Sequence, residues 1–226
     1  DINKLYVQKG ERHGSITEIL KLAKQNKVII QEVDKIKLDK MSETHNHQGV
    51  IAVVPPYEYC DVDDILEYAK SKGEDPVIFI LDGIEDPHNL GSIIRTAECS
   101  GVHGIIIPKR RSASVNSTVN KTSAGAVQYM KIARVNNLNE TINYLKERNI
   151  WIYGTDMDGK SFYDEQNYSG GVGVVIGSEG FGMSRLVKEN CDFLIKIPMT
   201  GHINSLNASV SSAIVMYEIM KQRRNA

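Results

Sequence analysis

From residue 77 onward, short apolar runs alternate along the chain with amphipathic segments. The apolar runs have the length of strands, and the segments between them show the spacing of apolar positions that is typical of helices. Because buried parallel strands are joined by helices, this alternation predicts an α/β fold with a mostly parallel sheet and helices on both faces. The predicted strands are 77–83, 104–108, 130–135, 151–156, 171–177 and 193–199.

The first 57 residues show the same alternation on a smaller scale. Ser15 has the chemistry of an N-cap and Glu18 stands at the matching capping-box position, so a helix is expected to begin there. Residues 1–57 are therefore expected to form a small α/β domain. Its predicted strands and helices are 4–10, 15–26, 28–34, 35–44 and 48–54.

Residues 58–75 separate these two regions and are strongly acidic. The net charge of the whole chain is −1, made up of +2 for residues 1–57, −5 for 58–75 and +2 for 76–226. Prolines bracket the acidic segment, and its aspartates suit the first turn of a helix, where the dipole favours negative charge. We expect an acidic linker helix over 58–75 between two mildly basic lobes.

Several classes of protein are disfavoured by composition. No apolar run is long enough to span a membrane and no basic leader is present, which favours a cytoplasmic protein. The start at Asp1 suggests that a preceding segment is missing. Cys60, Cys99 and Cys191 lack the paired spacing of a metal or redox site, so they are expected to be reduced structural thiols.

Three polar segments stand where a strand gives way to a helix. They are DPHNLGSIIRTAE (86–98), IGSEGFGM (176–183) and IPMTGHINSLNASVSSA (197–213). The carboxyl ends of parallel strands meet at one edge of a sheet, and open α/β folds bind their ligands there. The sequence therefore predicts the functional site at this edge.

Each polar segment also has a purely structural interpretation. Asn89 suits a helix N-cap, and Ser205 or Asn207 suits the N-cap of the last helix. Arg95 could be an ordinary surface arginine. The glycines of 176–183 suit a tight turn, which leaves a role for Glu179 open.

The glycine pattern argues against nucleotide-binding folds. Neither G-x-G-x-x-G nor a P-loop follows the strand at 77–83, as a Rossmann-type oxidoreductase or an NTPase would require.

In combination and in this order, the three segments resemble the motifs of the SpoU family of S-adenosylmethionine-dependent RNA ribose 2'-O-methyltransferases, within the SPOUT superfamily. The resemblance covers about residues 77–224. The first lobe, with THNHQGVIAVV, is similar to the ribosomal-protein-like RNA-binding domain of bacterial members that methylate a guanosine of 23S rRNA, without its first helix. The resemblance implies a C-terminal trefoil knot, S-adenosyl-L-methionine as cofactor, an RNA substrate and a homodimer.

The resemblance also assigns roles to residues that match the motifs. The catalytic and RNA-binding centre would hold Asn89, Arg95, Glu179, Ser205 and Asn207. The cofactor would be contacted by Thr155, Gly177, Ile197, Met199 and Leu206.

Methyl transfer from a sulfonium to a hydroxyl is a displacement that depends mainly on positioning, and it requires no metal. The pair His45 and His47 is accordingly expected in a solvated or RNA-facing loop. Arg95 stays protonated and is a poor base, so it is expected to clamp a phosphate and lower the pKa of the hydroxyl.

Positive residues outside the pocket are expected to contact RNA, because phosphates are neutralised by Lys and Arg. The candidates are Arg12, His47, Lys109, Arg110, Arg111 and Lys121. If the protein is a methyltransferase, tRNA is the alternative substrate. A non-catalytic RNA-binding protein with this fold is the alternative of another class.

A last helix is predicted over about 207–224. Its apolar stripe, expected either to pack on the sheet or to form a dimer contact, is Val210, Ala213, Ile214, Tyr217 and Met220.

Overall fold

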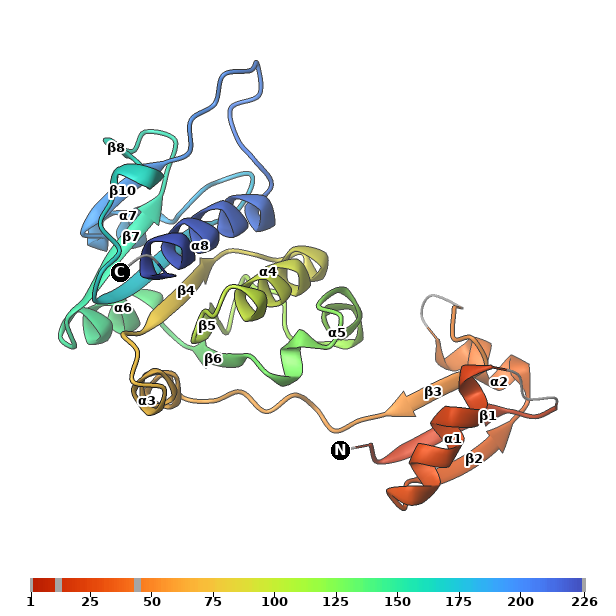
Figure 1. The fold of residues 1–226 in the computed structure, drawn as a ribbon. Coiled ribbons are helices and arrows are strands. Elements are labelled where there is room, and N and C mark those ends of the chain that lie inside the picture. Colours follow the sequence, from red (N-terminus) through yellow and green to blue (C-terminus); the bar gives the residue numbers. More distant parts are fainter. Residues whose placement is uncertain (1, 11–13, 43–45, 225–226) are drawn as a thin grey trace. The chain divides into compact units, whose positions relative to one another are not determined.

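The computed structural model describes residues 2–10, 14–42 and 46–224. The chain forms two compact units, Asp1–Tyr57 and Glu58–Ala226. Arg12 and His45, two residues of interest in the sequence, lie outside the described residues. Figure 1 shows the helices and strands of each unit.

The first unit is a three-stranded sheet with helix α1 (Ser15–Gln25) packed on it. Strand β1 (Lys4–Gln8) lies in the centre, parallel to β2 (Ile29–Val33) and antiparallel to β3 (Val50–Val53). Leu5 and Val7 of β1 are buried against Leu20 and Ala23 of α1. A second helix, α2 (Lys35–Met41), follows β2. The predicted small α/β unit is present in this form.

The start of α1 differs from the prediction. The N-cap is Gly14, with φ 62° and ψ −132°, and no side chain caps the helix. Ser15 is therefore already the first helical residue, and the prediction that it caps the helix was wrong. The left-handed φ at Gly14 is easily adopted by glycine, which lets the chain turn into the helix without a polar cap.

The second unit is built on a seven-stranded sheet in which every pairing is parallel, in the order β6-β5-β4-β9-β7-β10-β8. The predicted mostly parallel sheet is confirmed. The additional strand, β8, has two residues and lies at an edge, and it is too short to show a pattern in the sequence. The strands are β4 (Val77–Asp82), β5 (Gly104–Pro108), β6 (Lys131–Val135), β7 (Ile150–Thr155), β8 (Ser161–Phe162), β9 (Gly171–Gly177) and β10 (Phe193–Lys196).

Helices cover both faces of this sheet (Figure 1). On one face, α3 (Val62–Ser71), α6 (Leu138–Lys146) and α7 (Arg185–Asn190) contribute to a core with alternate residues of the strands. On the other face lie α4 (Pro87–Cys99) and α8 (Ala208–Arg224), which pack against each other. The short α5 (Ser117–Thr122) packs on α4.

Helix α3 occupies the acidic segment in which a linker helix is expected, and it belongs to the second unit. Ile65 and Ala69 are fully buried, and Ile65 is part of the core beneath the sheet. Two of the aspartates, Asp63 and Asp64, lie in the first turn of the helix as expected. The backbone N–H of Asp61 donates to Asp64 Oδ2 at 2.8 Å. The acidic side chains thus cap a helix that packs on β6.

The buried face of α8 is not the predicted one. Val210 and Tyr217 of the predicted stripe are each 45% exposed, so this stripe does not pack on the sheet of its own chain. The pattern was obscured because the buried face includes polar residues that bond within the helix: the Ser212 hydroxyl donates to Ala208 O, and Glu218 accepts from Gln222. The buried positions are Ala208, Ser212, Val215, Met216, Glu218 and Ile219.

Within the described ranges, none of the helices has both the length and the apolar character needed to cross a membrane.

Candidate functional site

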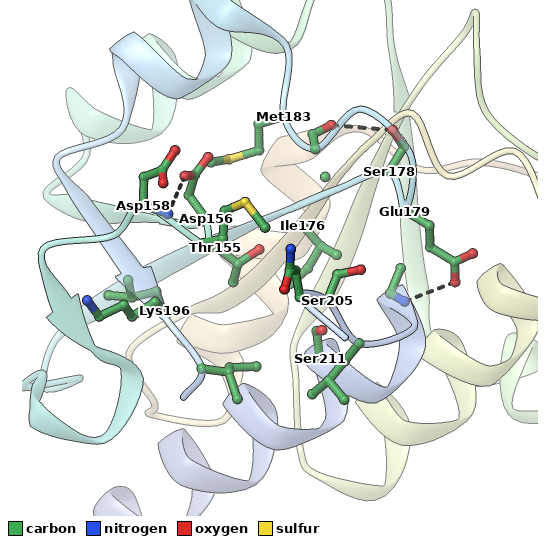
Figure 2. Close-up of a pocket in the computed structure, with 18 of the residues that line it drawn as sticks. Thr155, Asp156, Asp158, Ile176, Ser178, Glu179, Met183, Lys196, Ser205 and Ser211 are labelled. Atoms are coloured by element: carbon green, nitrogen blue, oxygen red, sulfur yellow. Dashed lines mark hydrogen bonds between the residues drawn. The ribbon is translucent and has the colours of Figure 1, made fainter. Parts of the chain in front are cut away.

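A pocket of about 990 Å³ opens at the carboxyl ends of β7, β9 and β10, the edge at which the sequence predicts the site (Figure 2). The loop after β9 and residues 197–199 and 204–206 close it, together with the first turn of α8. Five of its lining residues are those that the resemblance assigns to the cofactor. They are Thr155, Gly177, Ile197, Met199 and Leu206.

The loop from Ser178 to Gly182 forms one wall of the pocket and is held by its backbone. Ser178 N donates to Gly182 O at 3.0 Å, and Gly182 N donates back to Ser178 O at 2.9 Å. Gly177 packs directly against this turn, and a Cβ at Gly177 would lie well inside contact distance of the backbone of Gly182 and Met183. Glycine is therefore required at residue 177 by the close approach of two backbone segments.

The opposite end of the pocket carries charge. Lys188 Nζ pairs with Asp156 Oδ2 at 2.8 Å, and the hydrogen bond to Asp156 raises the pKa of this lysine. Asp156 also accepts from the backbone N–H of Asp158 at 2.9 Å, so it is fixed from two sides. This ion pair could not be predicted from the sequence, because it joins the end of β7 to α7, which are distant in the chain. The aspartate that follows Thr155 was the one signal in the sequence.

A cluster of amides and one carboxylate lies beside the pocket. Glu179 Oε1 accepts hydrogen bonds from Asn89 Nδ2 at 3.1 Å, from Ala208 N at 3.1 Å and from Asn207 Nδ2. Asn207 Nδ2 also lies 2.9 Å from Asn89 Oδ1. Figure 2 shows Glu179 directed at the first turn of α8. The three polar segments of the sequence thus meet through Asn89, Glu179 and Asn207.

The structure decides which of these residues act as caps. Asp86 is the N-cap of α4 and accepts from His88 N at 2.8 Å, so the interpretation of Asn89 as a cap is wrong. Asn207 does cap α8, because its Oδ1 accepts from Ser209 N at 2.9 Å and Val210 N at 3.3 Å. Its amide nitrogen is left to bind Asn89 and Glu179.

Two further candidate residues, Ser205 and Arg95, lie outside this cluster. Ser205 lines the pocket and is exposed. Arg95 lies on the exposed side of α4, six residues or about 9 Å of helical rise beyond Asn89. It does not line the pocket, and among the described residues it has no hydrogen-bond or ion-pair partner.

The basic candidates fall into two groups. Lys109, Arg110 and Arg111 follow β5 and are exposed, as is Lys121 at the end of α5. His47, in the first unit, is occupied: its ring bonds Asp39 Oδ1 at 3.0 Å and accepts from Gly49 N at 2.9 Å, and its side chain is 5% exposed. The structure gives the ring of His47 a role in holding the turn before β3.

No group of three or more His, Cys, Asp and Glu side chains in the described part of the chain is arranged to hold a metal ion.

Comparison with protein families identifies the chain. The model described as the SpoU rRNA Methylase family matches residues 76–217, which include the whole pocket and the amide–carboxylate cluster. The chain belongs to this family. The model described as RNA 2'-O ribose methyltransferase substrate binding matches residues 1–60.

Relatives of the SpoU chain support the assignment. A Staphylococcus saprophyticus protein named as a TrmH family tRNA/rRNA methyltransferase is 52% identical over 222 residues, covering 98% of this chain and 89% of the relative. The crystal structure of the SpoU methyltransferase AviRb from Streptomyces viridochromogenes in complex with AdoMet is similar with a TM-score of 0.82 and 25% identity, covering 100% of this chain and 85% of AviRb. An A. aeolicus TrmH/SpoU tRNA modifying enzyme covers 67% of this chain and 77% of its own, with 28% identity and a TM-score of 0.62.

The protein is thus an RNA methyltransferase of the SpoU family, and its cofactor is S-adenosylmethionine. The pocket suits this molecule. Its apolar walls from Ile176, Ile197 and Leu206 can hold a flat base, and the carboxylate of Glu179, which has no cationic partner among the described residues, favours a cationic ligand.

Proposed function

We propose that the protein transfers a methyl group to a ribose 2'-hydroxyl of structured RNA, most specifically to a guanosine of 23S rRNA. The observation that carries this proposal is the cluster of Asn89, Glu179 and Asn207 at the edge of the cofactor pocket. Neutral amides and a carboxylate suit the hydrogen bonds of a ribose. The match of residues 1–60 to a substrate-binding domain of RNA 2'-O ribose methyltransferases supports the same conclusion.

Bound S-adenosylmethionine supplies a methyl group that is already activated on a sulfonium. The contribution of the chain is therefore to hold the hydroxyl in line with that methyl group. Glu179 Oε1 is occupied by its three donors, which fixes Asn89 and Asn207 in place. Glu179 Oε2 has no donor among the described residues, and we assign it to a ribose hydroxyl. Ser205, in the wall of the pocket, is positioned to bond the same sugar.

The role proposed for Arg95 is to bind an RNA phosphate and to stabilise the developing alkoxide by its charge. A guanidinium remains protonated at physiological pH, so it cannot serve as the base. The proton would leave to a phosphate oxygen or to water. Because Arg95 is exposed and lies outside the pocket wall, it is free to meet RNA that approaches along α4.

The proposal includes a homodimer and the trefoil knot implied by the resemblance. The exposed stripe of α8 is the surface that a second copy would cover, with Val210 and Tyr217 at 45% exposure each. Sedimentation of the wild type and of a Tyr217→Asp variant tests this: a dimer that becomes a monomer on substitution is expected, and a monomeric wild type would refute it.

The decisive experiment is to incubate the protein with labelled S-adenosylmethionine and undermodified total RNA, and to map the labelled nucleoside by mass spectrometry. Label on a guanosine ribose of 23S rRNA is expected. Label in tRNA only would establish tRNA as the substrate. This alternative is consistent with the names of the relatives, which mention both tRNA and rRNA. Absence of label from both RNAs would favour a non-catalytic RNA-binding protein.

A further inference from the structure

One side chain beside the pocket has no function in the cofactor site or the amide–carboxylate cluster. Phe181 lies at the tip of the loop after β9 and lines the mouth of the pocket. It is 96% exposed, the highest value among the large hydrophobic side chains that the structure describes. A single exposed apolar residue is ordinary on a protein surface, so exposure alone does not indicate a function. The setting of Phe181 is what distinguishes it.

The backbone under Phe181 is fixed. Ser178 and Gly182 exchange two hydrogen bonds across the loop, and Phe181 N donates to Ser178 Oγ at 3.4 Å. Glu179, two residues earlier, is tied to α8 by its hydrogen bond from Ala208 N. The ring is therefore presented to solvent by an ordered turn.

The space around the ring is open. Phe181 stands between Gly180 and Gly182, and a Cβ added at either glycine would meet no atom within 4 Å. No neighbouring side chain in the loop blocks a flat group from approaching the ring. Ile203 lies in the chain between the pocket-lining residues Met199 and Asn204, and it is a second exposed apolar side chain, at 74%.

The short distance along the chain between Phe181 and Glu179 suggests that the Phe181 ring would contact an RNA base. Glu179 and Phe181 have Cα atoms at most about 7 Å apart. Neighbouring bases in a nucleic-acid strand are spaced by about 3.4 Å. A ribose held at Glu179 therefore brings its own base, or the base of the next nucleotide, within reach of the ring.

We propose that Phe181 is a stacking site for an unpaired RNA base at or next to the methylated nucleotide. This inference rests on the proposed function. Aromatic side chains bind unpaired bases by stacking, and sequence-specific recognition of RNA mostly targets loops, bulges and ends whose bases can be splayed out. By holding the displaced base, Phe181 acts as a positioning residue for the ribose. It also favours loops and bulges over regular duplex as substrates.

The test compares Phe181→Ala, Phe181→Leu and Phe181→Trp with the wild type in steady-state methylation of unmodified 23S rRNA transcript. Loss of one stacked base is expected to raise KM for RNA by about five- to 150-fold in the Ala variant. The Leu variant, which keeps apolar volume without a π face, should resemble Ala, and Trp should restore the wild-type KM. The KM for S-adenosylmethionine should stay unchanged in all three.

Trp151→Leu serves as the control, because Trp151 is a 53% exposed aromatic at the start of β7, at the opposite end of the strand from Thr155. An RNA KM for Phe181→Ala equal to that of the wild type would overturn the inference while leaving the proposed function intact. A wild type that does not methylate RNA would overturn both. Conversion of a dimer to a monomer by Phe181→Leu, with the RNA KM unchanged, would place the ring against a second copy and overturn the stacking role.

Discussion

Asn207 donates a hydrogen bond from Nδ2 to Asn89 Oδ1 at 2.9 Å, although 118 residues separate the two asparagines in the sequence. The same nitrogen bonds Glu179, so a single amide joins the start of α8 to α4 and to the loop after β9. Asn207 also caps α8 through its Oδ1. One side chain therefore has a structural role and a role in the site, carried by different atoms.

These two roles can be separated by Asn207→Ser. Serine retains an oxygen for the cap but lacks the amide donor, so thermal stability should change little while kcat/KM falls by roughly 100-fold through misplacement of the cluster. The matched control is Asn137→Ser, the same change at the cap of α6, where Asn137 accepts from Asn139 N at 3.0 Å. An Asn207→Ser enzyme as active as the control would remove Asn207 from the site.

Substitution of Arg95 tests the proposed phosphate clamp. Arg95→Ala should abolish methyl transfer and leave the affinity for S-adenosylmethionine unchanged, because Arg95 lies outside the pocket wall. Arg95→Lys should recover only part of the activity, since lysine offers a point charge without the bidentate fork. Turnover and calorimetric cofactor binding measured on the same preparations check both statements, and retained turnover in the Ala variant would contradict the assignment.

The close approach at Gly177 predicts a loss of both stability and cofactor binding. In Gly177→Ala the new Cβ meets backbone atoms of Gly182 and Met183, which cannot rotate away as a side chain would. A decrease of at least about 1–3 kcal/mol in the free energy of unfolding is expected, with weaker binding of S-adenosylmethionine. Gly180→Ala, in the same loop, meets no atom within 4 Å and should behave as the wild type.

The basic residues after β5 should determine the response of RNA binding to salt. Arg110→Glu, alone and with Arg111→Glu, is expected to lower RNA affinity and to reduce the slope of log Kd against log salt concentration, because fewer counterions are released. Lys70→Glu reverses an exposed charge on α3, which packs on the face of the sheet opposite to α4, and provides the control. Filter binding across a salt series measures both quantities; equal slopes for Arg110→Glu and Lys70→Glu would argue against this surface.

Stability should fall in mild acid because of His103. This side chain is 1% exposed, and burial lowers its pKa below the ordinary 6.5 despite the hydrogen bond to Glu74. Its Nδ1 accepts from Val77 N at 2.9 Å, so the neutral ring is the bonded form. A depressed pKa in the folded state gives stability that is present above pH 6.5 and is lost as the pH falls through and below that value.

Urea unfolding at pH 7.5 and at pH 5.0 checks this prediction. His103→Gln, which does not titrate and can offer an acceptor to Val77 and a donor to Glu74, should show a smaller loss of stability between the two pH values. The same loss in both proteins would assign the acid sensitivity to other groups.

The sequence predicted the main sheet because its central strands β4, β5 and β9 are apolar runs buried on both sides. It could not predict the two-residue β8, or the stripe on α8 in which Ser212 and Glu218 are buried. Motif positions located the pocket, but the cluster depends on contacts between residues about a hundred positions apart. Asn89 was one possible cap in the sequence, and the structure shows that Asp86, followed by Pro87, takes this role.

The partners of Glu179 also determine when the site can form during synthesis. Its donors include Asn207 and the backbone N–H of Ala208, which follow it in the sequence by 28 and 29 residues. Domains fold as their residues emerge from the ribosome, and here the last helix must emerge before the carboxylate is satisfied. A nascent chain that still lacks α8 would leave Glu179 without two of its three donors, so the site cannot be complete before residues 207 and 208 have been synthesised.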